Sequence, residues 1–280
     1  LIFVNGQNVG ALNGVWTRGK FDITGVVHPS GPNALAVLIR AGTGSSDHPE
    51  TDKGQGFCGH NIQGNECHPA IPGDGNGIYA EVYLTSTQDV LVRDPYVTTE
   101  LPNSDNSVAD LTVRVDLTNA SDHAVSGILR GTIGKLAFEQ PVTLAPHEHR
   151  AVSFEPASYP ALHIASPQLW WPNGYGDPTL QTLHVQFVLP DHSISDRKTL
   201  TFGMRKITYD TTSPQGLRIL VNGVPIFCRG GSWMSPDLFM RYNAVQADID
   251  GRFHREMGFT MVRFWKGQVP FRQAFDACDR

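Results

Sequence analysis

The stretch Leu111-Thr112-Val113-Arg114-Val115-Asp116-Leu117 alternates strictly between apolar and polar side chains. In an extended strand, successive side chains point to opposite faces, so the four apolar residues share one face and the three polar residues the other. The pattern predicts a strand with one buried face and one solvated face. It is typical of an antiparallel sheet in a layered β fold.

Similar short strands follow at regular intervals, separated by turn residues and without a helical stretch between them. We expect them at 125–133, 142–144, 151–154, 182–189 and 199–202. Several short strands at this spacing indicate a β-sandwich of immunoglobulin-like size over residues 95–204. The Cys…Trp…Cys signature of true immunoglobulin domains is missing, so the prediction concerns the architecture alone.

The pattern changes after residue 204. Asn222-Gly223 lies between two apolar runs and predicts a hairpin turn, because both turn residues must accept a positive φ. A helix is then expected, capped by Asn243 and ended by Gly258, with Val245, Ile249, Phe253 and Met257 on one face. Residues 259–265 predict a buried strand and Pro270 a second helix, and Cys228 and Cys278 are expected to be small buried residues. Strand, helix, strand, helix is typical of the beginning of an α/β fold.

Residues 1–94 indicate a further antiparallel β domain. Asn5-Gly6 predicts a hairpin turn, and strands are expected at 21–23, 35–39, 78–84 and 90–92. Residues 41–77 form a long stretch rich in Gly, Asp and His without periodicity. Since the chain begins inside one predicted strand and stops inside a predicted helix, we expect it to be a piece of a longer protein.

Composition excludes several classes of function. The 280 residues carry 22 Lys and Arg against 27 Asp and Glu, a formal charge of −5 without a basic run, which disfavours nucleic-acid or membrane-surface binding. No apolar stretch reaches the roughly 18 residues that a membrane span needs. With 28 Gly and 19 Pro, the chain is typical of a turn-rich β protein.

Four motifs, in this order, resemble glycoside hydrolase family 2. Gly77–Leu84 resembles the closing strand of the sugar-binding domain, Leu169–Gly176 is similar to the Trp-Trp-Pro-x-Gly segment of the sandwich domain, and Val221–Gly231 is similar to the entry into the catalytic barrel. Pro236–Arg241, together with Phe259–Gln268, is most similar to the exo-β-glucosaminidase and β-mannosidase branch. The resemblance implies a mainly β, multidomain chain: a jelly-roll sugar-binding-type domain at 1–94, an immunoglobulin-like sandwich at 95–204 and the first βα units of a truncated (β/α)₈ barrel at 205–280.

The resemblance also implies a chemistry. Family members are retaining enzymes in which one carboxylic acid protonates the glycosidic oxygen and a carboxylate about 5–5.5 Å away attacks the anomeric carbon. Both are glutamates on late barrel strands, which this chain does not reach, so no catalytic residue is assigned here and the chain alone is expected to be inactive. The chemistry needs no metal or organic cofactor. The expected partners are an oligo- or polysaccharide substrate and the missing C-terminal barrel of the same chain.

Six residues are candidates for substrate binding. Asp237 follows the first predicted barrel strand and could bind sugar hydroxyls, although a loop or helix-cap role is the alternative. Trp233 and Trp265 follow the two predicted barrel strands; indole rings suit the apolar faces of pyranose rings, but packing is equally open. Arg263 lies in a predicted strand, where its positive charge needs a partner. The resemblance implies that this Arg supports the nucleophile. Gln268 is a weaker candidate, and Trp170-Trp171 are expected to pack inside the sandwich.

Glu66 is the sixth candidate. The branch usually has a Trp-Asp-Trp-like motif at this place, whereas this chain has Asn65-Glu66-Cys67, which keeps the charge but lengthens the side chain. Substrate contact and a solvated loop position are both open. Cys58, His60, Cys67 and His68 lie close together, but their spacing is unusual for zinc; a Cys58–Cys67 disulfide or free thiols are the alternatives.

The sequence therefore predicts the N-terminal portion of an exo-acting β-glycosidase for a β-glucosaminide, β-mannoside or β-galactoside. Two alternatives are a non-catalytic carbohydrate-binding β-sandwich module and a structural sandwich of an adhesion type. The predicted strand–helix repeat after residue 205 disfavours both. Breakdown of polysaccharide suggests a periplasmic or secreted protein.

Overall fold

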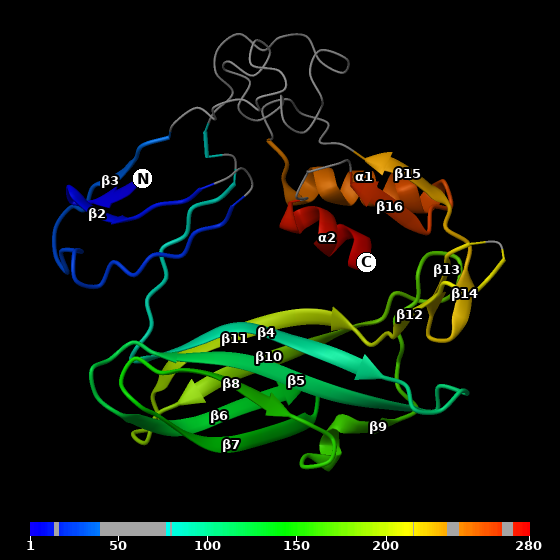
Figure 1. Ribbon diagram of the computed structural model, residues 1–280, viewed down its shortest axis with the longest axis horizontal. Coiled ribbons are helices and arrows are strands. Elements are labelled where there is room, and N and C mark those ends of the chain that lie inside the picture. The colour runs from blue at the N-terminus through cyan, green and yellow to red at the C-terminus, as the bar shows by residue number, and fades with distance from the viewer. Residues whose placement is uncertain (14–16, 40–76, 79, 215, 234–240, 265–270) are drawn as a thin grey trace, which may run out of the picture. The chain divides into compact units, whose positions relative to one another are not determined.

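The computed structural model describes residues 1–13, 17–39, 77–78, 80–214, 216–233, 241–264 and 271–280 (Figure 1). The chain divides into two compact units. The first contains residues 1–82, 231–247 and 262–274, and the second contains residues 83–230, 248–261 and 275–280. The chain is mainly β, as predicted.

The second unit contains the sandwich. One sheet has the strand order β11-β10-β6-β7, and the other has the order β4-β5-β8, with β9 paired to β5 (Figure 1). The strand bounds are β4 Val90–Glu100, β5 Val108–Asn119, β6 Val125–Ile133, β7 Leu136–Leu144, β8 His149–Phe154, β9 His163–Ala165, β10 Leu180–Val188 and β11 Ile194–Gly203. A short 3₁₀ turn, Pro160–Leu162, precedes β9.

Both sheets contribute to one hydrophobic core. Leu111, Val113, Val115 and Leu117 of β5 are buried in it, which confirms the alternation that predicted this strand. The facing sheet supplies Leu129, Phe138, Leu183 and Phe187, among others. All five sandwich strands predicted after residue 117 are present, with bounds that differ by a few residues.

The edge strands β4 and β11 are joined by side chains where the two sheets meet. Ser195 is buried; its hydroxyl donates to the Val90 carbonyl oxygen and accepts from the Val90 N–H, both at 2.8 Å. The Val92 N–H donates to Asp196 Oδ2 at 2.9 Å. Backbone groups of an edge strand that would otherwise be unpaired inside the protein are thereby satisfied.

The chain then forms a three-stranded sheet from β12 Ile207–Asp210, β13 Arg218–Val221 and β14 Val224–Ile226. Asn222 and Gly223 form the turn between β13 and β14 with φ of +52° and +79°, which confirms the predicted hairpin. The strand–helix repeat follows as β15 Gly230–Trp233, α1 Ala244–Glu256, β16 Met261–Phe264 and α2 Arg272–Asp279.

The helix signals at both ends of α1 are confirmed. Asn243 Oδ1 accepts from the Gln246 N–H at 3.0 Å as the N-terminal cap, and Gly258 has φ +76° after the last turn. Of the four residues predicted to share one face of α1, Val245, Phe253 and Met257 are exposed, and Ala247 is the residue of α1 that is buried. Cys228 and Cys278 are exposed as well, contrary to prediction, because the elements that carry them leave these side chains uncovered.

The N-terminal part of the first unit contains β1 Ile2–Val4, β2 Gln7–Gly10 and β3 Leu35–Val37, in the order β2-β1-β3. The Asn5-Gly6 turn is confirmed by φ of +50° and +79°. Predicted strands at 21–23 and 78–84 are wrong, since the residues described there are irregular. Val82, Tyr83 and Leu84 are more than 60% exposed, so they lack the burial that favours a strand.

None of the helices described is long and apolar enough to cross a membrane.

Candidate functional site

The candidate site lies on the two-stranded sheet formed by β15 and β16. These strands approach closely at their beginnings, where a Cβ added to Gly230 would collide with the Met261 carbonyl oxygen. Just before the strands, the Arg229 carbonyl oxygen accepts from the Thr260 N–H at 2.8 Å. Glycine at position 230 is therefore required by backbone packing.

Arg263 and Ser232 face one another across this sheet. Arg263 Nη1 donates to Ser232 Oγ at 2.9 Å, and the Arg263 side chain is exposed. Because successive strand residues point to opposite faces, Arg263 and Ser232 lie on the face opposite to Phe264 and Trp233. The hydrogen bond to Ser232 on the neighbouring strand thus orients the planar guanidinium of Arg263 on the sheet surface.

Trp233 lies in an aromatic cluster on the other face. Its ring centroid is 5.3 Å from that of Tyr242 and 5.4 Å from that of Phe264, both edge-to-face. Tyr242 in turn contacts Phe271 at 5.2 Å, and both of these residues are buried. Aromatic contacts of this kind stabilise packing, so the geometry favours the packing alternative for Trp233 over sugar stacking.

The other predicted site residues lie outside the described part of the chain. These are Asp237, Trp265, Gln268 and Glu66, together with the cysteines and histidines at 58, 60, 67 and 68. The structure brings together Arg263 and Trp233 on adjacent strands but on opposite faces. Among the residues that are described, no group of three or more His, Cys, Asp or Glu is placed to hold a metal ion.

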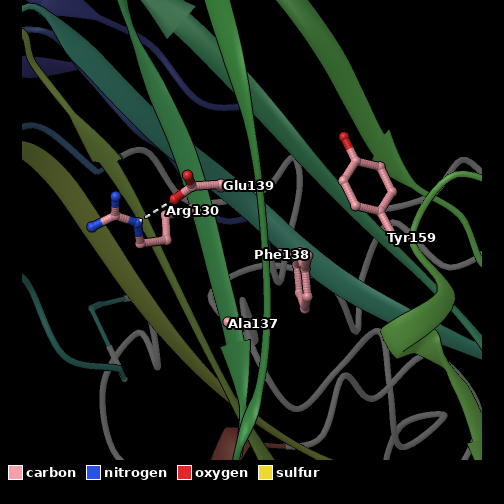
Figure 2. Close-up of a pocket in the computed structure, with 5 residues that line it drawn as sticks. All are labelled: Arg130, Ala137, Phe138, Glu139 and Tyr159. Atoms are coloured by element: carbon pink, nitrogen blue, oxygen red, sulfur yellow. Dashed lines mark hydrogen bonds and ion pairs between the residues drawn. The ribbon is translucent and has the colours of Figure 1, made fainter.

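A hollow of about 390 Å³ lies on the sandwich, lined by Arg130, Ala137, Phe138, Glu139 and Tyr159 (Figure 2). Arg130 Nε and Glu139 Oε2 form an ion pair at 2.7 Å across its rim. Tyr159 donates to Gln140 Oε1 at 2.8 Å and packs edge-to-face on Phe154. Glu139 is the single carboxylate among these lining residues, so they do not form the pair that glycoside hydrolysis requires.

Sequence reasoning missed Ser232 and Tyr242. Ser232 stands two residues after Gly230 on the same strand face, but its contact with Arg263 depends on the register between β15 and β16, which no local pattern reports. Tyr242 directly precedes the Asn243 cap, and an aromatic residue at that position is a signal for packing at a helix N-terminus.

A known protein family is similar to the sandwich, and known proteins are similar to the whole chain. Residues 90–205 match the family model "Glycosyl hydrolases family 2". The chain is 30% identical to an exo-beta-D-glucosaminidase of Streptomyces avermitilis, over 100% of this chain and 29% of that protein. It is 26% identical to a mannosylglycoprotein endo-beta-mannosidase of Lilium longiflorum, over 98% of this chain and 30% of that protein.

Solved structures show the same likeness. The exo-chitosanase of Amycolatopsis orientalis, in complex with PNP-beta-D-glucosamine, superimposes with a TM-score of 0.84 at 29% identity, over 99% of this chain and 30% of that one. A beta-glucuronidase of Bacteroides uniformis, with a TM-score of 0.73 and 19% identity, shows the fold alone. The chain thus spans about 30% of the length of the relatives it matches. Its sandwich, at residues 90–205, is a domain of glycosyl hydrolases family 2.

Proposed function

We propose that this chain is the N-terminal portion of a retaining, exo-acting β-glycosidase. The observation that carries the proposal is the similarity over the whole chain, at 30% identity, to an exo-beta-D-glucosaminidase. The likeness to an exo-chitosanase that holds an aryl β-D-glucosaminide supports it further.

In the proposed mechanism, the catalytic acid and the nucleophile are carboxylates supplied by chain beyond residue 280. The role of this chain is to bind and orient the terminal sugar. Arg263, held by Ser232 at 2.9 Å, would place a permanent positive charge beside the nucleophile, favouring its ionised form. Asp237, Glu66, Trp265 and Gln268 are the proposed contacts to sugar hydroxyls and ring faces, and Trp233 would support them from the aromatic cluster.

A sheet face with three exposed apolar side chains supports the proposal that further chain completes the catalytic domain. The pairing of β12, β13 and β14 places Ile207, Val221 and Val224 in one row, and Tyr209, Ile219 and Ile226 in the next. Tyr209 is 65% exposed, and Ile207 and Val224 are exposed too. Exposed apolar side chains gathered on one sheet face are typical of a contact surface, so another part of the whole enzyme is expected to cover these three.

The proposed substrate is an oligo- or polysaccharide with a terminal β-linked sugar. A glucosamine ammonium group would be favoured by the carboxylates of Asp237 and Glu66, while β-mannosides and β-galactosides are the alternatives. The test is hydrolysis of p-nitrophenyl β-D-glucosaminide, β-D-mannoside and β-D-galactoside by the full-length protein. We expect turnover of at least one, with the β-anomer as the first product by proton NMR.

Two outcomes would refute this proposal: no turnover of any of the three glycosides, or an α-anomer as the first product. Binding of chito-oligosaccharide by the full-length protein without hydrolysis would instead favour a non-catalytic carbohydrate-binding module. Breakdown of polysaccharide further leads us to propose a periplasmic or secreted location, which fractionation of the source cells would test.

A further inference from the structure

The loop between β9 and β10 reaches the C-terminal ends of both helices. Trp170 Nε1 donates to the Asp279 carbonyl oxygen, in the last residue of α2, at 2.7 Å. Asn173 Nδ2 donates to the Arg255 carbonyl oxygen at 2.9 Å and to that of Phe259 at 3.0 Å, at the end of α1 and just beyond it. The last carbonyl groups of a helix have no partner within the helix, so these side chains provide hydrogen bonds that the helices lack.

The same loop is fixed to the sandwich. The Trp170 N–H donates to the carbonyl oxygen of buried Met204 at 2.9 Å. The Trp170 side chain lies over Gly203, where an added Cβ would come within 2.6 Å of Trp170 Cβ. Arg205, two residues further on, stacks its guanidinium 4.3 Å above the Trp170 ring and pairs with Asp279 Oδ1 at 3.5 Å. Trp170 therefore packs against β11 and is hydrogen-bonded to α2.

Two more contacts tie the loop to the hairpin that leads into β15. Buried Asn222, in the β13–β14 turn, donates from Nδ2 to the Trp170 carbonyl oxygen at 3.0 Å. The Phe227 N–H, just after β14, donates to the Tyr175 hydroxyl oxygen at 2.9 Å. One short loop thus contacts the chain before β15, after α1 and at the end of α2.

Within the second unit, the described parts of the two helices also contact each other. They meet where Gly251 of α1 faces Ala277 of α2, at 3.3 Å from an added Cβ, and where Arg280 forms an ion pair with Asp248. Phe253, Met257 and Phe275 are exposed.

We propose that Trp170–Tyr175 is a clamp loop that couples the two helices to the sandwich, so that the helix ends open to solvent when the clamp is released. Within the second unit, the clamp holds the C-terminal parts of both helices to the sandwich through hydrogen bonds. The proposed coupling concerns the structure of this chain and does not depend on its proposed role in glycoside hydrolysis.

The first test is Asn173→Asp in the full 280-residue chain. The substitution keeps the shape but replaces the donor with a carboxylate that faces two carbonyl oxygens. Amide hydrogen exchange should become at least about tenfold faster in residues 249–259 and 275–280, because two hydrogen bonds are lost and replaced by repulsion. Protection in β6 and β10 should stay within twofold. The matched control is Asn33→Asp, since Asn33 Nδ2 likewise donates to a carbonyl oxygen, that of His28 at 3.0 Å, and lies in the first unit.

A second pair keeps the proposal testable if Asn173→Asp does not fold. Trp170→Phe removes the indole donor and retains an aromatic ring, and exchange at 275–280 should be about fivefold faster. Trp171→Phe is the control, because the Trp171 ring packs over Gly176 within the loop itself. Exchange at the helix ends that matches the parent chain in both test variants would overturn the clamp. An equal rise in every strand of the sandwich would also overturn it, since the effect would then be general destabilisation.

Discussion

Asn222 combines a left-handed backbone conformation with hydrogen bonds from its side chain and its backbone at one buried position. Its φ is +52°, its Oδ1 accepts from the Lys206 N–H at 2.9 Å, and its Nδ2 donates to Trp170. Its own carbonyl oxygen accepts from Asn106 Nδ2 at 3.0 Å. A residue with this many constraints tolerates few substitutions.

Asn222→Ala should lower the free energy of unfolding by about 2–4 kcal/mol, because two part-buried backbone groups lose partners and alanine is strained at positive φ. Asn222→Gly should cost about 1 kcal/mol less, since glycine relieves the backbone strain alone. Urea denaturation of both variants measures the difference. Equal losses in the two variants would mean that the left-handed conformation contributes nothing.

Glu148 is a residue whose ionised form is preferred in the folded chain. It accepts from the Ala145 N–H at 2.7 Å and pairs with Arg150, and the first of these contacts does most to lower the pKa of its carboxyl. A lowered pKa stabilises the fold above the unfolded-state pKa, and this stabilisation is lost as the pH falls through the folded-state value.

We therefore expect the melting temperature of Glu148→Gln to lie below that of the parent chain at pH 7, and the gap to close as the pH falls toward 3. Thermal unfolding followed by circular dichroism from pH 3 to 7 tests this, with Glu155→Gln as the control. A gap that stays constant over this range would show that the charge of Glu148 is not involved.

At the scale of elements, β6 depends on glycines over which aromatic rings pack. The ring of Phe138 lies directly on Gly131 and leaves no space for a Cβ. A Cβ at Gly127 would come within 2.6 Å of the Val188 carbonyl oxygen on the neighbouring strand.

Gly131→Ala should destabilise the chain by about 1–3 kcal/mol, because the core must shift to admit one methyl group. Gly25→Ala is the control, as nothing lies within 4 Å of its added Cβ. Chemical denaturation of the two variants provides the comparison. A Gly131→Ala variant as stable as the parent would show that the Phe138 ring moves aside at little cost.

The N-terminus of α1 depends on one side chain. Asn243→Ala removes the acceptor for the Gln246 N–H and should cost the helix about 1 kcal/mol, whereas Asn243→Ser retains a cap. Hydrogen exchange at residues 246–250 should rise roughly fivefold in the alanine variant alone. The same rise in Asn243→Ser would argue against the cap.

Sequence predicts elements best where local chemistry decides them. The alternation at 111–117, both Asn-Gly turns, the Asn243 cap and the left-handed Gly258 depend on neighbours in the chain, and all are confirmed. The strands predicted at 21–23 and 78–84 are wrong, because an apolar run becomes a strand only when a partner strand and a packing surface hold it.

The candidate site was less predictable for the same reason. Arg263 is identifiable as a strand charge in need of a partner, but its contact with Ser232 depends on cross-strand register. Trp233 is identifiable as an aromatic residue at a strand end, whereas its packing against Tyr242 and Phe264 arises only in three dimensions.

At the scale of the whole molecule, we propose that sugar binding and catalysis are performed by different parts of the protein. The chain matches about 30% of the length of its relatives, and its sandwich matches the model of glycosyl hydrolases family 2. Under the proposed function, these 280 residues bind and orient sugar, while the acid and the nucleophile come from the rest of the protein.

The most direct measurement compares turnover of p-nitrophenyl β-glycosides by the isolated 280-residue chain and by the full-length protein, at equal molar concentration. We expect steady release of p-nitrophenol by the full-length protein and none above the buffer rate by the isolated chain. Release by the isolated chain would contradict it, because the carboxylate pair would then lie within these 280 residues.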